Sequence, residues 1–166
     1  MADAETVARI IRLNGGKLIG KTRLQKSAYF LEALGVGFEL DFTYHHYGPY
    51  SEELEYLAND ARALDLVDID WRRSSEGAKY AIYLDRSGDL PKDSKDARRV
   101  EALKILGQYS STELELAATA DFLARSGYGD DAWEETERRK FSKTSPDWVA
   151  RAQELLKRLE AGGRGD

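Results

Sequence analysis

Apolar residues in the first third of the chain follow helical spacing before they change to a strand pattern. Residues 5–14 carry one apolar helical stripe, and Gly15-Gly16 ends this predicted helix. A second helix is predicted to open at Thr22, which forms a capping-box pattern with Gln25. Gly35 suits the position just after the end of that helix, because glycine accepts a left-handed backbone.

Residues 38–45 alternate between apolar and polar side chains at period two, which predicts a half-buried strand. Gly48-Pro49 is expected to break this strand, and Ser51 to cap a third helix. Residues 66–71 and 79–84 then predict a β-hairpin. The order of helix, helix, strand, helix and hairpin is that of a winged helix.

The rest of the chain is predicted to be helical, with helices near 94–107, 110–126, 131–139 and 146–160. Ser110 and Glu113 form a capping-box pattern, and Ser145-Pro146 supplies an N-cap followed by proline. The predicted fold class is α+β and mainly helical, with a winged-helix-like N-terminal half packed against C-terminal helices. We expect a single domain over residues 1–160 and a disordered tail over residues 161–166.

Composition narrows the classes of function. The chain has 166 residues, a formal net charge of -5 and no cysteine, which excludes disulfides, thiolate zinc sites and cysteine nucleophiles. The N-terminus is acidic and no apolar run is long enough for a membrane span, so we expect a cytoplasmic protein without a membrane partner. The acidic balance favours a protein partner, preferably a basic one, over nucleic acid.

Candidate catalytic chemistry is sparse. His45 and His46 are adjacent, so on a strand they point to opposite faces and cannot share one metal ion. One histidine with a distant carboxylate remains an alternative. No nucleophile motif and no phosphate-loop spacing is present. We therefore expect no catalytic residue, no metal, no cofactor and no enzymatic activity.

Nucleic-acid binding is the main alternative, because the predicted element order matches a winged helix. The third helix, residues 51–62, carries four acids against one arginine and would repel phosphates. Lys17, Lys21, Arg23 and Lys26 instead form a basic cluster at the second helix. A winged-helix DNA-binding regulator thus stays open as the second hypothesis.

The segment 44–50, Tyr-His-His-Tyr-Gly-Pro-Tyr, concentrates aromatic residues on one bend. Tyrosine suits a contact surface, because it has an apolar ring and a polar tip. Core packing under a Gly-Pro turn is an equal alternative. The candidate partner contacts are His46, Tyr47, Pro49 and Tyr50, with Lys21, Arg23 and Lys26 as a secondary surface.

These stretches also resemble a known family. KTRLQKSAYF at residues 21–30, followed by FTYHHYGPYSEEL at residues 42–54, resembles the signature of YwgA-like proteins, which are similar to the Panacea (SocA-like) antitoxin domain. The resemblance covers about residues 5–160, including helices like those of the family at 111–119 and 152–159. It implies a compact, mainly helical domain with a small sheet. It further implies non-catalytic neutralisation of a cognate toxin by direct contact.

Overall fold

The computed structural model describes residues 1–163. Its α-helices are α1 (Ala4–Leu13), α2 (Lys21–Ala33), α3 (Glu52–Ala63), α4 (Asp96–Leu106), α5 (Ser111–Leu123), α6 (Ala132–Arg139) and α7 (Pro146–Gly163). Its strands are β1 (Lys17–Ile19), β2 (Thr43–His45), β3 (Gly48–Tyr50), β4 (Val67–Arg73) and β5 (Lys79–Asp85). Short helical turns are η1 (Ala124–Tyr128), η2 (Gly129–Asp131) and η3 (Phe141–Lys143). The predicted α+β, mainly helical class is confirmed.

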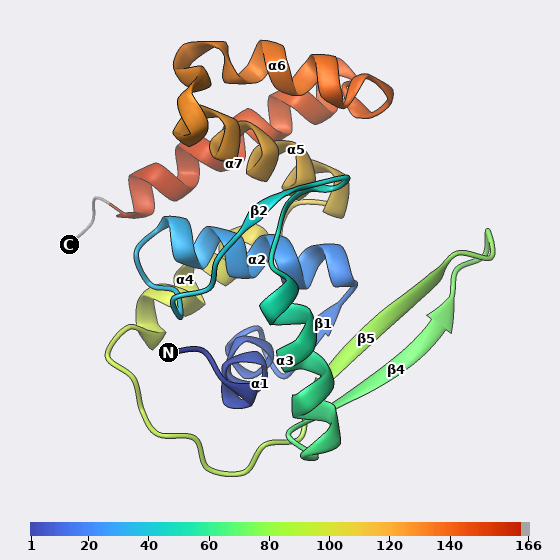
Figure 1. Cartoon of the computed structure of the whole chain (residues 1–166), viewed down its shortest axis with the longest axis vertical. Helices are drawn as coiled ribbons and strands as arrows, with labels where there is room; N and C mark the ends of the chain where they lie inside the picture. Colours follow the sequence, from blue (N-terminus) through green and yellow to red (C-terminus); the bar gives the residue numbers. More distant parts are fainter. Residues whose placement is uncertain (164–166) are drawn as a thin grey trace.

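The larger sheet has three antiparallel strands in the order β1-β5-β4. Its β4–β5 hairpin was predicted, and it extends away from the helices in Figure 1. Strand β1 was not predicted, and it pairs with β5 over only three residues. A three-residue strand is too short to display an alternating pattern.

The strand predicted over residues 38–45 is wrong in extent, because only its last three residues form β2. Gly48-Pro49 does not end the pairing, since β3 turns back and pairs with β2. Leu40 is nevertheless buried, as its alternation predicted. The backbone N–H groups of Phe38 and Glu39 donate to the carboxylate of Glu32, at 2.9 and 2.8 Å, instead of entering a sheet. The alternating pattern of residues 38–42 therefore indicates which side chains are buried, although these residues form no strand.

Helix α2 is the central element of the fold (Figure 1). Every residue from Leu24 to Leu31 is buried. Leu24 and Leu31 pack in a cluster with α1, α3 and the larger sheet, whereas Tyr29 and Phe30 pack in a second cluster with α4, α5 and α7. A helix buried all round joins two hydrophobic clusters.

The helix ends partly follow the predictions. Ser110 and Glu113 form the predicted capping box of α5, and the hydroxyl of Ser51 accepts from the backbone N–H of Leu54 at 3.1 Å. The capping box predicted for Thr22 and Gln25 is wrong, because α2 starts after Gly20 without a side-chain cap. The Gln25 side chain instead bonds to the backbone of Ser51.

The chain end differs from the predicted tail. Residues 161–163 belong to α7, so the tail predicted from residue 161 starts too early, and residues 164–166 lie outside the described part. Within residues 1–163, no helix has both the length and the apolar character that crossing a membrane requires. The single-domain and winged-helix-like assignments stay predictions.

Candidate functional site

Residues 43–50, called the aromatic hairpin below, form a two-stranded unit whose turn is His46 and Tyr47. The rings of His45 and Tyr50 lie 5.0 Å apart, and those of His46 and Tyr47 lie 4.9 Å apart, edge to face. An isolated two-stranded hairpin is marginally stable. Contacts from the rest of the molecule must therefore hold it.

Two buried polar side chains of α2 bind the backbone where the hairpin leads into α3. The side chain of Gln25 donates to the carbonyl of Ser51 at 2.9 Å and accepts from its N–H at 2.8 Å. The ammonium of Lys26 donates to the carbonyl of Pro49 at 2.6 Å. Because Lys26 is only 1% exposed, this bond forms in a largely water-free environment. The direction in which β3 enters α3 is thus fixed by α2.

The other side of the hairpin is held by a lysine cluster around Glu115, which is buried on α5. Lys140 donates to the carbonyl of His46 at 2.6 Å and lies 3.6 Å from Glu115. Lys143 bonds to Glu115 at 2.9 Å. Burial lowers the pKa of Lys26 to about 8, with Glu115 opposing the shift and the two other lysines adding to it. The negative charge of Glu115 thus acts on three ammonium groups.

Close packing also explains the glycine of the hairpin. Gly48 has φ 89°, a left-handed conformation that favours glycine. A Cβ atom at this position would lie 2.5 Å from the Thr119 hydroxyl oxygen. That hydroxyl is buried and has no hydrogen-bond partner within the part of the chain described. The backbone of β3 therefore rests directly on α5.

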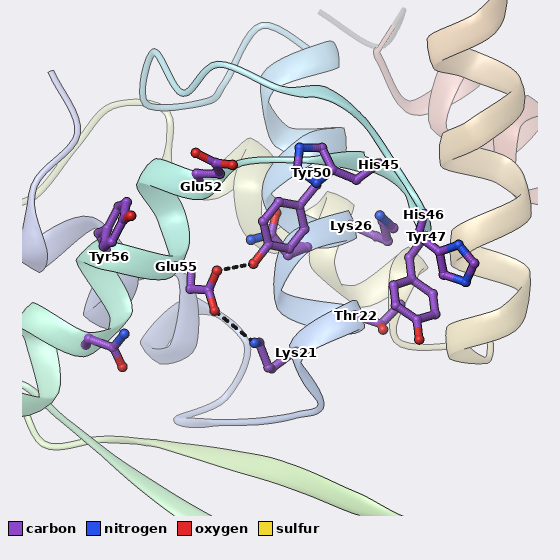
Figure 2. A pocket seen from close by; sticks show the side chains of 12 residues that line it. Lys21, Thr22, Lys26, His45, His46, Tyr47, Tyr50, Glu52, Glu55 and Tyr56 are labelled. Atoms are coloured by element: carbon purple, nitrogen blue, oxygen red, sulfur yellow. Dashed lines mark hydrogen bonds and ion pairs between the residues drawn. The ribbon is translucent and has the colours of Figure 1, made fainter.

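A cavity of ≈ 750 Å³ opens between the aromatic hairpin, α2 and α3 (Figure 2). Its volume lies in the range of small-molecule and side-chain binding pockets. The lining residues are Lys21, Thr22, Gln25, Lys26, His45, His46, Tyr47, Tyr50, Glu52, Glu55, Tyr56 and Asn59.

A hydrogen-bonded chain crosses this cavity. The hydroxyl of Tyr50 donates to Glu55, whose other carboxylate oxygen accepts from Lys21 at 3.0 Å (Figure 2). These bonds, that of Tyr50 first, hold the pKa of Glu55 below its ordinary value. Burial and the neighbouring carboxylate raise the pKa of Tyr50. Lys21 and Glu55 thus remain a neutralised pair.

The structure brings most of the predicted contact residues together and separates two of them. Pro49 is buried, and its carbonyl accepts the hydrogen bond of the Lys26 ammonium. Arg23 points elsewhere, because its guanidinium donates to the carbonyls of Leu106 and Tyr109. The three predicted basic residues of α2 therefore bind different partners and do not form one basic surface. The predicted residues that line the cavity are Lys21, Lys26, His46, Tyr47 and Tyr50.

One wall of the cavity was not predicted from the sequence; it is formed by Glu52, Tyr56 and Asn59 of α3. Their spacing of four and three residues places them on one helix face. That spacing is visible in the sequence and is the signal that predicts this shared face. Within the described residues, no group of three or more His, Asp or Glu side chains is placed to hold a metal ion.

The chain is similar to the uncharacterized protein YwgA of Bacillus subtilis (strain 168), with 27% identity over 109 residues. The similarity covers 64% of this chain and 66% of the relative, just under two thirds of its length. No family model matches the chain. The likeness to YwgA noted in the sequence is thus supported, whereas the Panacea antitoxin assignment stays a prediction.

Replacing Gly48 by Ala tests the contact between β3 and α5. We expect the free energy of unfolding to fall by on the order of 3 kcal/mol, from the left-handed backbone and from the clash with Thr119. Urea denaturation measures the loss. Gly88→Ala is the matched control, since no atom lies within 4 Å of its added Cβ. Equal effects of the two substitutions would contradict the close approach.

Replacing Lys26 by Met tests the burial of its charge. Between pH 8 and 10.5 the unfolded chain binds more protons than the folded one, because the pKa of Lys26 falls from 10.5 to about 8 on folding. The contribution of Lys26 to the free energy of unfolding therefore rises with pH. We expect the difference, wild type minus Lys26→Met, to increase by on the order of 2 kcal/mol from about pH 8 to about pH 10 in urea titrations.

Lys157→Met is the control for this experiment, because Lys157 is exposed on α7. Its difference curve should stay flat over the same pH range. If the Lys26→Met curve is equally flat, the ammonium of Lys26 is not desolvated in the folded chain.

Proposed function

We propose that the chain is a non-catalytic protein-binding module whose partner docks at the cavity beside the aromatic hairpin. The observation that carries this proposal is that exposed aromatic side chains lie at a cavity whose hairpin backbone is fixed by hydrogen bonds. Tyr47 is 54% exposed and Tyr56 is 68% exposed, and both line the cavity. Tyrosines are favoured at contact sites, since their rings bury large areas at little conformational cost.

Preorganisation of the hairpin supports the same proposal. The carbonyls of His46 and Pro49, on either side of Tyr47, each accept a hydrogen bond from a buried lysine. A contact residue held in place before binding loses less conformational entropy when the partner arrives. The hairpin therefore presents Tyr47 as a fixed anchor.

The chemistry of the cavity agrees with binding better than with catalysis. Glu55 is tied to Tyr50 and Lys21, and its pKa is lowered, so it is a weak base. The ammonium of Lys26 is bound to the Pro49 carbonyl. Each of these polar groups already has a partner within the chain, which leaves the aromatic rim for contacts.

The resemblance to YwgA-like and Panacea proteins suggests which partner to look for. We propose antitoxin-like neutralisation of a cognate toxin by direct contact, in the cytoplasm. The net charge of -5 suits a partner with a basic contact surface. A gene that is lethal alone and tolerated together with this chain would encode such a partner.

Photo-crosslinking at the cavity rim tests the proposed function. With benzoylphenylalanine at Tyr47 or Tyr56, we expect a specific protein adduct from lysate of the source organism. The Tyr47→Ala, Tyr56→Ala double variant should lower capture of that protein by at least about tenfold, because exposed aromatic anchors dominate binding energy.

Leu64 supplies the matched control, since it is 64% exposed at the end of α3 and does not line the cavity. A crosslinker at Leu64 should give no such adduct, and Leu64→Ala should leave capture unchanged. Equal adducts from both regions would place the contact elsewhere and refute the proposal.

Nucleic-acid binding is the second candidate, favoured by the tip of the β4–β5 hairpin rather than by α2. Residues 71–79 carry three cations and one carboxylate. Lys79 lies 4.6 Å from the exposed Trp71 ring, and Arg73 donates to the Gly77 carbonyl. Arg72 is partly neutralised by Asp70, at 2.8 Å. In the predicted winged-helix-like arrangement, this hairpin would be the wing.

Fluorescence anisotropy with a labelled DNA duplex tests this candidate. Three phosphate contacts would give a slope of about −2.7 for log affinity against log salt. Arg73→Glu with Lys79→Glu should abolish binding, whereas Lys157→Glu on the distant α7 should not (Figure 1). No binding at low salt, or equal loss in the control, would exclude the hairpin as a nucleic-acid contact.

A further inference from the structure

The cavity contains a carboxylate without a partner. Within the part of the chain that the structure describes, Glu52 makes no hydrogen bond or ion pair, although it lines the cavity. Glu55, the other carboxylate in the lining, is already bound by Lys21 and Tyr50. Glu52 lies in the first turn of α3, where the helix dipole stabilises a negative charge.

The cations of the lining are engaged. Lys21 is paired with Glu55, and Lys26 is buried against the Pro49 carbonyl. A ligand that enters the cavity beside α3 therefore meets the free negative charge of Glu52. A cationic group gains an ion pair there, whereas an anionic group would be repelled.

An exposed aromatic ring lies on the same face of the helix. Tyr56 follows Glu52 by four residues, which places the two side chains one above the other on α3, and both line the cavity (Figure 2). A ring face attracts a cation within about 6 Å of its centre. This chain already uses such contacts, with Arg139 4.8 Å from the Tyr44 ring and Lys143 5.1 Å from the Tyr47 ring.

We propose that the cavity recognises a cationic side chain of the protein partner, an arginine whose guanidinium pairs with Glu52 and stacks on Tyr56. Arginine fits better than lysine, because its planar fork binds a carboxylate with two hydrogen bonds and also stacks on an aromatic ring. This inference rests on the proposed function, and it adds the chemistry of the residue that the partner inserts.

The probe for this inference is Nα-acetyl-L-arginine amide, with Nα-acetyl-L-citrulline amide as its neutral isostere. Amide chemical shifts of the whole chain are followed by NMR at low salt. We expect arginine to shift the signals of Glu52 to Tyr56 and of Tyr50. Citrulline should bind about tenfold more weakly, because it lacks the charge but keeps the shape.

Two variants make the test specific. Glu52→Gln should reduce the affinity for the arginine probe about three- to tenfold, towards that of the citrulline probe. The affinity for the citrulline probe should stay unchanged. Glu53→Gln is the matched control, since Glu53 is also exposed in the first turn of α3 but does not line the cavity. Equal binding of arginine and citrulline, or an equal loss in both variants, would overturn the inference.

The result is separable from the test of the proposed function. If the crosslinkers at Tyr47 and Tyr56 capture a partner but Glu52→Gln neither weakens arginine binding nor reduces capture, only the cationic recognition is refuted. If arginine binds at Glu52 while no partner is captured, the cation site stands and the protein-binding function is refuted.

Discussion

Hydrogen bonds from two buried side chains of α2 to the backbone at Pro49 and Ser51 hold the candidate site together. Gln25 satisfies both backbone groups of Ser51, and Lys26 binds the carbonyl of Pro49. Polar groups buried without partners cost free energy, so these side chains and this backbone segment require each other. The consequence extends to the cavity, because the same segment ends the aromatic hairpin and begins α3.

The C-terminal helices complete this arrangement from the other side. Glu115 of α5 balances part of the charge of Lys26, Lys140 and Lys143, and Lys140 also binds the carbonyl of His46. A buried ammonium without a nearby carboxylate would be expensive, so Glu115 permits the lysine contacts to the turn and to β3 of the hairpin. The hairpin is therefore held by α2 on one side and by the C-terminal part of the chain on the other, and is not a free loop.

Some charged groups that line the resulting cavity are paired within the chain, and one is not. Lys21 and Glu55 neutralise each other, and the Tyr50 hydroxyl is committed to the same chain of hydrogen bonds. Glu52 and Tyr56 are open to a ligand on the adjoining helix face. This division connects the proposed function to its chemistry: paired groups shape the cavity, and unpaired groups offer recognition.

The sequence by itself determined the features that depend on neighbouring residues. Hydrophobic spacing and caps predicted most helices and the β4–β5 hairpin, and the aromatic run identified the hairpin region, because these signals are local. Tertiary structure alone decided the rest. The pattern of Gln25 resembled a cap and that of Lys26 a surface cation, yet both are buried against a segment more than twenty residues away. Residues 38–42 alternate like a strand but found no strand to pair with. The partner of a buried polar group depends on contacts between segments distant in the sequence. The pattern of neighbouring residues does not predict such contacts.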